Sequence, residues 1–499
     1  MSYVIGIDLG TGSVKGLVVD RNGEVVLEAA APYPSIHSQK GYSEQDPAEW
    51  LNGTKNVLKQ LITKKPELKE QLEAISFSGQ MHSLVLLDEN QQPIRNAILW
   101  NDVRTTKQCK EITEKLGDRL VEKTKNLALE GFTLPKILWV KEHEPDNWAK
   151  AKHFLLPKDY LALQLTGNLQ MEYSDAAGTL LLNVMEKKWD MESADVFDIP
   201  RDMFPKLVSS LENVGQIKHS LRAELGLKTT VNVFAGGADN ACAALGAGIV
   251  TENRGLCSIG TSGVFLAYEG NQAKDYHGKL HFFNHVIPDT YYSMGVTLAA
   301  GQSLTWFKET FAKEQTFEQL LESGKDSSIG ADGLLFTPYI MGERTPHIDS
   351  KIRGSFIGMD ASHTINDFTR AVLEGIIFSL KDTQMLMDEN AGKEFEEIVS
   401  VGGGAKSELW LQIQADIFNT KIVTLKTEQG PGLGAAMLAA VGVGWFDTLK
   451  DCVEQFVVYE KEYSPDPKAA ESYQDFYKLY HQVYAQTKEL CEQLNELEQ

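Results

Sequence analysis

The sequence has no cysteine pattern that would indicate a metal site or a disulfide framework. Five cysteines are present, none with metal-ligand spacing, and an odd number fits reduced thiols; they are Cys109, Cys242, Cys257, Cys452 and Cys491. No uninterrupted apolar run reaches the length that crosses a membrane. The first residues pass straight into a strand pattern without a basic segment, so we expect no signal peptide and a cytoplasmic protein.

Positive charge is also scarce. The 499 residues carry a net charge of −21, which argues against nucleic acid as a partner because its phosphates would be repelled. The same charge does not exclude ATP, since a local group of backbone amides and a metal ion can bind phosphate on an acidic protein. The hydrophobic content of 42% is that of a globular protein, and the length predicts two large domains.

The common nucleotide-binding loops are missing. No Gly-x-x-x-x-Gly-Lys-Ser/Thr motif occurs, and Gly10, Gly12 and Gly16 are not spaced as in a dinucleotide-binding loop. Residues 5–20, IGIDLGTGSVKGLVVD, instead predict a strand, a small flexible turn and a second strand. The turn amides of such a hairpin can face an anion.

A second hairpin of the same kind is predicted about half a chain later. Residues 256–270, LCSIGTSGVFLAYEG, match the first hairpin, with Gly260-Thr261 in the place of Gly10-Thr11. Gly and Thr are frequent turn residues, but two such hairpins are better explained by two related domains that face one nucleotide. We predict the boundary between these domains near residues 246–255.

Strand-like runs alternate with helical patterns along the whole chain, which predicts an α/β fold. Helices are expected at residues 46–61, 364–387 and 407–418. A C-terminal helix is expected to dock on the second domain through a stripe of apolar residues, namely Phe476, Leu479, Tyr480, Val483, Tyr484, Leu490 and Leu494.

The stretch 233–248, VFAGGADNACAALGAG, carries a carboxylate between a strand and a helix. Gly236 and Gly237 end the strand and permit close approach of a ligand, and Asp239-Asn240 begins an alanine-rich helix. An aspartate at this point is also a favoured helix cap. Because the second hairpin follows directly, we predict that Asp239 orients a substrate hydroxyl and accepts its proton during phosphoryl transfer.

Asp8 lies inside an apolar strand, where an unpaired carboxylate is costly. Phosphoryl transfer requires Mg²⁺, which is usually held by few carboxylates and several waters. We therefore predict that Asp8, with Asp239, contacts Mg²⁺ directly or through water.

Two polar stretches that follow apolar runs suit the binding of a small polyol. The first is Gln80-Met81-His82 and the second is Trp100-Asn101. A lone histidine is more often structural than a ligand, and an exposed turn explains the second stretch about as well as a sugar site. The polar pair around a methionine at a strand end favours sugar binding for the first.

Residues 399–418, VSVGGGAKSELWLQIQADIF, predict a strand, three glycines and an amphipathic helix. A tight turn would explain some of these glycines, but three in succession exceed what a turn requires. We predict that the backbone approaches a base or a phosphate there.

Two further stretches complete a resemblance to a known family. Residues 131–143, GFTLPKILWVKEH, and 354–375, GSFIGMDASHTINDFTRAVLEG, resemble the two signatures of the FGGY family of carbohydrate kinases. With the hairpins and the GGADN stretch, the resemblance covers the chain to about Phe446. It implies an α/β fold with two actin-like (ribonuclease H-like) domains of related topology, residues 1–247 and 248–499, and an ATP and sugar cleft between them.

The resemblance also implies an activity and a set of site residues. ATP and Mg²⁺ are the expected cofactors, Asp239 the proton acceptor, and a small sugar the partner, in a homodimer. The motifs QMH, ILWND, SDAAGTLLL, GGADNA and GERTPH look most like those of members acting on D-xylulose, apart from Ser83, where glycine is usual; its hydroxyl could alter the sugar preference. The implied sugar-binding residues are Gln80, Met81, His82, Trp100, Asn101 and Asn240. The implied ATP-binding residues are Gly10, Thr11, Gly12, Ser13, Lys15, Gly260, Thr261, Gly301, Thr305, Gly403 and Ser407.

Three other functions stay open at this point. One is the same chemistry on gluconate, L-ribulose or another pentulose. Another is an actin-like ATPase switch without a small acceptor, against which Asp239 and the stretch from Gln80 to His82 argue. The third is a dinucleotide-dependent oxidoreductase, which the glycine spacing of the first hairpin disfavours.

Overall fold

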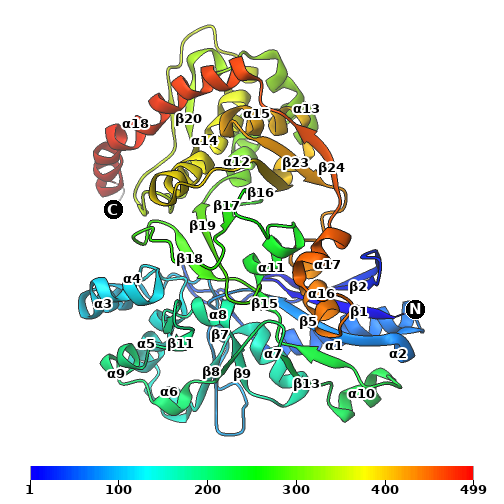
Figure 1. Cartoon of the computed structure of the whole chain (residues 1–499). Coiled ribbons are helices and arrows are strands. Elements are labelled where there is room, and N and C mark those ends of the chain that lie inside the picture. The colour runs from blue at the N-terminus through cyan, green and yellow to red at the C-terminus, as the bar shows by residue number, and fades with distance from the viewer. Residues whose placement is uncertain (1, 498–499) are drawn as a thin grey trace.

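The computed structural model describes residues 2–497, which form two α/β halves, one above the other in Figure 1. A seven-stranded sheet lies in each half. The first sheet contains β1 (Tyr3–Leu9), β2 (Ser13–Asp20), β3 (Val25–Pro32), β5 (Leu72–Gly79), β13 (Asn213–Gln216), β14 (Asn232–Phe234) and β15 (Gly237–Ala238). The second contains β16 (Arg254–Ile259), β17 (Gly263–Tyr268), β18 (His281–Asn284), β19 (Tyr291–Thr297), β22 (Glu397–Gly402), β23 (Lys421–Leu425) and β24 (Tyr459–Tyr463).

The two sheets share one topology, as the paired hairpins predicted. In the first, β3, β2 and β1 pair antiparallel, and β5 and β14 continue the sheet in parallel. In the second, β19, β17 and β16 pair antiparallel, and β22 and β23 continue in parallel. The predicted hairpins are β1–β2 and β16–β17. Because parallel strands end at one edge of a sheet, the residues after β1, β5 and β15 meet there.

The remaining elements surround these sheets. In the first half they are β4 (Glu44–Gln45), α1 (Pro47–Lys64), α2 (Leu68–Gln71), β6 (Val85–Leu87), β7 (Ala97–Ile98), α3 (Thr106–Leu116), α4 (Asp118–Thr124), α5 (Thr133–His143), α6 (Pro145–Lys150), β8 (His153–Leu155), α7 (Pro157–Thr166), β9 (Gln170–Glu172), α8 (Tyr173–Ala177), β10 (Leu182–Asn183), β11 (Lys188–Trp189), α9 (Met191–Val196), β12 (Lys206–Val208), α10 (His219–Leu225) and α11 (Asp239–Gly246). In the second half they are α12 (Gly301–Phe311), α13 (Phe317–Ser323), β20 (Leu335–Thr337), β21 (Ser355–Ile357), α14 (Ile365–Ala391), α15 (Glu408–Phe418) and α18 (Pro467–Leu497). Two helices from late in the chain, α16 (Gly430–Gly442) and α17 (Leu449–Phe456), lie beside the first half. Short 3₁₀ turns lie at 201–203, 324–326, 331–333 and 403–406.

The three helices predicted from sequence periodicity are present as α1, α14 and α15. Their start signals are the capping residues. The Asp46 carboxylate accepts a hydrogen bond from the amide of Ala48 at 2.9 Å, and the Ser407 hydroxyl accepts one from Trp410 at 3.3 Å.

Helix α16 crosses back to the first half of the molecule. Although it lies late in the chain, it packs on β1, β5 and α11 (Figure 1). Glycines permit this close approach: a Cβ at Gly6 would lie 2.0 Å from the carbonyl oxygen of Gly432, and one at Gly434 would lie 2.0 Å from that of Cys242. Helix α16, which lies between β23 and β24 of the second sheet in the chain, therefore ties the two halves together.

The C-terminal helix α18 covers the second half, but only part of the predicted stripe packs there (Figure 1). Tyr480 and Val483 are buried, whereas Leu479, Leu490 and Leu494 are more than half exposed, at 54%, 57% and 54%. The expectation that all of these residues form core packing was therefore wrong for the three leucines. Among residues 2–497, no helix combines the length and apolarity needed to span a bilayer.

Candidate active site

Two carboxylates meet at the edge where the first sheet's parallel strands end. Asp8 lies near the end of β1, opposite Ser78 of β5, and Ser78 is in turn opposite Gly237 of β15. Asp239 follows that strand as the first residue of α11. The strand register therefore brings Asp8 and Asp239, which are far apart in sequence, to one place.

The carboxyl groups of both aspartates have raised pKa values. Burial, and then the negative charge of Asp8, raises the pKa of Asp239 to about 7, although the amides of Asn240 stabilise its ionised form. Burial raises the pKa of Asp8 to about 6, with Ser78 and Lys15 acting in the opposite direction. A carboxyl with a pKa near neutrality can both accept and release a proton under physiological conditions.

Asn240 and a buried serine hold Asp239. The backbone and side-chain amides of Asn240 donate to Oδ1 of Asp239 at 2.7 Å and 3.0 Å. The Ser174 hydroxyl accepts from the amide of Ala238 at 2.9 Å and donates to the Glu172 carboxylate at 2.5 Å. The strand-to-helix turn that carries Asp239 is thereby fixed on both sides.

A cavity of about 240 Å³ lies beside Asp239 and is lined from both halves of the molecule. The first half supplies Met81, His82, Trp100, Leu129, Gly131, Phe132, Asp239 and Asn240; the second supplies Ser262, Val264, His281, Met294, Val296 and Arg344. We call it the small cavity. Four of the six residues predicted to bind sugar line it, together with the predicted base, and its size suits a small polyol.

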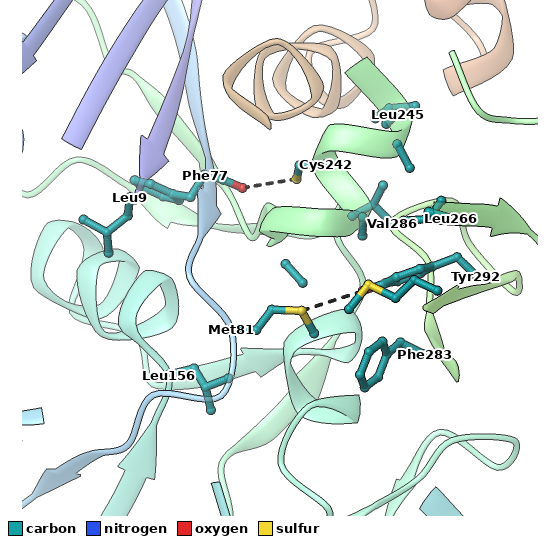
Figure 2. Close-up of a cluster of buried hydrophobic side chains, with 14 of the residues drawn as sticks. Leu9, Phe77, Met81, Leu156, Cys242, Leu245, Leu266, Phe283, Val286 and Tyr292 are labelled. Atoms are coloured by element: carbon teal, nitrogen blue, oxygen red, sulfur yellow. Dashed lines mark hydrogen bonds between the residues drawn. The ribbon is translucent and has the colours of Figure 1, made fainter. Parts of the chain in front are cut away.

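Met81 joins the two halves at the floor of the small cavity. Its thioether accepts hydrogen bonds from the hydroxyl of Tyr292 at 3.7 Å and from the side-chain amide of Asn240 at 3.8 Å. Figure 2 shows Met81, from the loop after β5, facing Tyr292 of β19. Both side chains are buried.

His82 is held in a defined orientation and tautomer. Its Nδ1 lies 2.7 Å from the carbonyl oxygen of Gly178 and must donate to it, which leaves Nε2 as an acceptor. Burial lowers the pKa of His82 to about 3, so the ring is neutral. The backbone φ of 66° is rare for a residue other than glycine, and such strain is typical of functional sites. A Cβ at Gly178 would lie 2.7 Å from Nδ1, so the contact requires a glycine.

Two residues predicted to bind sugar lie outside the lining of the small cavity. Gln80 is buried, and its amide donates to the side chain of Gln45 at 3.1 Å. Asn101 is exposed on a turn. Ser83 is also away from the cavity: its buried hydroxyl accepts from the amide of Trp100 at 3.0 Å. Its hydroxyl and amide also donate to the Met81 carbonyl, at 3.3 Å and 2.7 Å, so Ser83 can influence the small cavity through Trp100 and Met81.

The first hairpin touches the small cavity through Trp100. The indole Nε1 donates to the Thr11 hydroxyl at 2.9 Å, while the ring itself lines the cavity. The Gly10 amide is engaged with the Ser13 carbonyl at 3.1 Å, and Gly12 is exposed. Lys15 pairs with Glu28 at 3.1 Å and lies opposite Asp8 in the sheet.

A second cavity, of about 720 Å³, lies within the second half of the molecule, and we call it the large cavity. Its walls include every residue of that half predicted to bind ATP, namely Gly260, Thr261, Gly301, Thr305, Gly403 and Ser407. The apolar part of the lining consists of Ile259, Leu304, Phe317, Leu321, Leu409 and Trp410, and the remaining polar and charged part consists of Gln302, Glu318, Glu322, Lys325, Lys406 and Glu408. A volume of this size with a few polar groups on apolar walls suits a nucleotide.

The second hairpin and the start of α12 form one end of the large cavity. The Gly301 amide donates to the Gly260 carbonyl at 2.9 Å, and a Cβ at Gly301 would lie 2.4 Å from that oxygen. The next two amides of α12 are also engaged, since Gln302 donates to the Thr261 carbonyl and Ser303 to the Ala300 carbonyl, so this helix N-terminus attracts anions through its dipole. The phosphate end of a nucleotide is thus expected here.

The three glycines at 402–404 have separate roles. A Cβ at Gly402 would lie 2.6 Å from the Ile259 carbonyl oxygen, and one at Gly404 would lie 2.5 Å from the Ile259 side chain. Gly403 meets no atom closer than 3.4 Å and lines the large cavity. Packing against β16 thus requires two of the glycines, and the third leaves backbone open to a ligand.

Asp8 and Asp239, at the edge of the first sheet, provide some of the ligands that a divalent cation requires. In the part of the chain that the structure describes, no group of three or more His, Cys, Asp or Glu side chains forms a metal site. Asp8 and Asp239 nevertheless repel each other, and Mg²⁺ is commonly held by one or two carboxylates, substrate phosphates and water. A cation between these carboxylates would relieve that repulsion.

The sequence did not predict two residues that lie behind the lining of the small cavity and hold lining residues in place. The Lys136 ammonium is buried and donates to the carbonyl oxygens of Glu130, Gly131 and Phe132, which form one wall. Thr133 donates to the carbonyl oxygen of His82 at 2.9 Å. Both residues lie in the first signature stretch. The stretch is recognisable from its length, but only the structure shows what each of its residues contacts.

Comparisons with known proteins agree with this architecture. Residues 3–246 match the model of the N-terminal domain of the FGGY family of carbohydrate kinases, and residues 255–443 match that of the C-terminal domain. The chain is 54% identical to a xylulose kinase of Lactococcus lactis subsp. lactis, over 99% of both proteins. It is 53% identical to a xylulose kinase of Bacillus subtilis, over 98% of both. The solved structure of a ligand-bound xylulose kinase from Lactobacillus acidophilus is similar with a TM-score of 0.93 and 29% identity, covering 98% of this chain and 99% of that one.

Proposed function

Since the chain belongs to the FGGY family of carbohydrate kinases, we propose that it transfers the γ-phosphoryl group of ATP to the terminal hydroxyl of D-xylulose. The products are D-xylulose 5-phosphate and ADP. Full-length relatives with 54% and 53% identity are xylulose kinases, which supports this acceptor. The observation that carries the mechanism is the position of Asp239 in a small cavity lined from both halves.

Asp239 accepts the proton of the attacking hydroxyl. Its pKa of about 7 suits this exchange near neutral pH, and Asn240 and the Ser174–Ala238 contact keep the carboxylate oriented. The sugar lies in the small cavity against His82 and Trp100. The hydroxyl attacks the γ-phosphorus in line while the bond to the ADP oxygen breaks.

ATP binds in the large cavity, with its phosphates toward the two hairpins. The apolar lining covers the adenosine, and Gly260, Thr261 and the start of α12 face the phosphates. Mg²⁺ held at Asp8 and Asp239 would neutralise charge that develops on the phosphates. The homodimer and the cytoplasmic location expected from the sequence remain predictions.

A coupled assay of ADP release tests the proposal. Purified protein with ATP and Mg²⁺ is supplied with D-xylulose, L-ribulose, gluconate, glycerol or no acceptor. We expect strong stimulation by D-xylulose. A preference for gluconate or L-ribulose would retain the kinase and replace its substrate. ADP release without stimulation by any sugar would favour an ATPase switch.

A further inference from the structure

The guanidinium of Arg344 lines the small cavity without a partner. Within residues 2–497 it makes neither a hydrogen bond nor an ion pair, although the backbone of Arg344 is fully engaged. Burial lowers the pKa of this side chain. Arg344 is half-buried, and the charges of Glu130 and Glu343 act on it without direct contact. A partly desolvated guanidinium without a hydrogen-bond acceptor is costly, so its position beside the sugar cavity favours a ligand that supplies the acceptor.

The residues on either side of Arg344 fix its backbone to β19. The buried Glu343 carboxylate accepts from the amides of Leu298 at 3.0 Å and of Arg344 itself at 2.7 Å. The Thr345 amide donates to the Val296 carbonyl at 3.0 Å, and its hydroxyl accepts from the Val296 amide at 3.0 Å. These contacts hold the segment rigidly while the Arg344 side chain stays available to the cavity.

The other titratable side chains around the small cavity are acceptors. His82 has its free Nε2, as described above. The Nδ1 of His281 lies 3.0 Å from the Asn126 side-chain oxygen, to which it donates, so its Nε2 also accepts. The Asp239 carboxylate accepts when ionised. Arginine has five N–H donors and no acceptor, so Arg344 is the one charged donor in this lining.

The chemistry of the acceptor supplies the complementary atom. The ring form of a 2-ketopentose closes when the hydroxyl on C5 adds to C2, so a kinase that phosphorylates that hydroxyl must bind the open chain. The open chain carries a free ketone oxygen, which accepts hydrogen bonds and cannot donate them. Its four hydroxyls can donate to His82, His281 and Asp239.

We propose that Arg344 hydrogen-bonds the ketone end of the open-chain sugar and thereby selects ketoses over the corresponding alditols. This inference rests on the proposed function. Arg344 lines the small cavity with His82 and His281, whose pKa values are lowered by burial and, to a smaller extent, by its charge, whereas Asp8 is the charged group that acts on Asp239. The sugar therefore lies with its terminal hydroxyl at Asp239 and its carbonyl toward the imidazoles and Arg344.

Steady-state kinetics of Arg344→Met and Arg344→Lys with D-xylulose and with xylitol, its alditol, test the inference. In the wild type we expect a higher kcat/KM for D-xylulose. Arg344→Met should lower kcat/KM for D-xylulose about 10- to 100-fold, mainly through KM, as expected for the loss of a charged hydrogen bond. The kcat/KM for xylitol should fall less than that for D-xylulose, the KM for ATP should change little, and Arg344→Lys should be intermediate.

Arg353→Met is the matched control, because Arg353 is exposed and, among the residues that the structure describes, donates only to the backbone oxygens of Ser350 and Ile352. Calorimetric titration of each variant with D-xylulose gives the affinity without turnover, and thermal unfolding reports folding. An equal loss for both acceptors, a raised KM for ATP or an unchanged ratio of ketose to alditol would overturn the inference. A wild type that turns over neither acceptor would instead contradict the proposed function.

Discussion

At the scale of single residues, the site depends on carboxylates that stay partly protonated near neutral pH. Asp239 combines burial, the nearby charge of Asp8 and hydrogen bonds from Asn240. The first two raise its pKa and the third lowers it, with a result of about 7. This balance suits a proton acceptor and has a consequence for stability.

The raised pKa predicts that Asp239 destabilises the metal-free protein at higher pH. The unfolded carboxyl has a pKa of about 3.9, so between pH 4 and 7 the folded state binds more protons and stability falls as pH rises. In Asp239→Asn the side chain does not ionise, so this loss of stability at higher pH is absent. In a chelator, we expect its thermal midpoint to exceed that of the wild type by more at pH 8 than at pH 5.

Asp447→Asn, at an exposed loop position, is the control for that measurement. It should show the same difference from the wild type at both pH values. If Asp239→Asn also shifts the midpoint equally at pH 5 and pH 8, the carboxyl does not have the raised pKa described above.

At the scale of helices and strands, glycines set how closely the elements approach. Helix α16 lies on β1 with the carbonyl of Gly432 against Gly6, in space that a Cβ would occupy. This contact supports the strand that carries Asp8. It joins a late helix to the first strand of the chain, so it also links the two halves.

Gly6→Ala is predicted to destabilise the protein by about 1–3 kcal/mol, because the added methyl group overlaps backbone atoms of α16. The measurement is the thermal midpoint. Gly12→Ala serves as the control, since a Cβ there meets no atom within 4 Å. Equal midpoints for the two variants would show that α16 can move away without cost.

Local sequence patterns predict some of these elements and site residues but not others. The two hairpins, the α/β alternation and Asp239 are predictable because each depends on a short local pattern. Arg344 could not be assigned a role, since the side chains that line the small cavity with it are far away in sequence. The partners of Lys136 are near in sequence, but they are backbone carbonyls and carry no side-chain pattern. The exposed leucines of α18 were mispredicted because helical spacing shows a stripe but not how much of it is covered.

At the scale of the whole molecule, the two cavities differ in which half of the molecule lines them. The large cavity is lined by the second half alone, whereas the small cavity takes residues from both. In the proposed function, the adenosine would lie against the second half alone, the phosphates would reach the first hairpin, and the sugar would contact both halves. Closure around the sugar would exclude water, which otherwise competes as phosphoryl acceptor.

Small-angle X-ray scattering should detect whether the two halves close when sugar is bound in addition to nucleotide. We expect D-xylulose with a non-hydrolysable ATP analogue to give a smaller radius of gyration than the analogue alone, because sugar contacts hold the halves together. The analogue alone should leave the radius close to that of the free protein. Full contraction with nucleotide alone would mean that the sugar does not control closure.

The proposed role of Asp239 as proton acceptor is tested most directly by comparing ADP release by the wild type and by Asp239→Asn with D-xylulose, ATP and Mg²⁺. Calorimetry checks that both proteins bind the sugar. This role predicts that kcat falls about 10²- to 10⁴-fold in the variant, since the hydroxyl loses its proton acceptor, while the sugar still binds. A folded Asp239→Asn protein with near-normal turnover would contradict it.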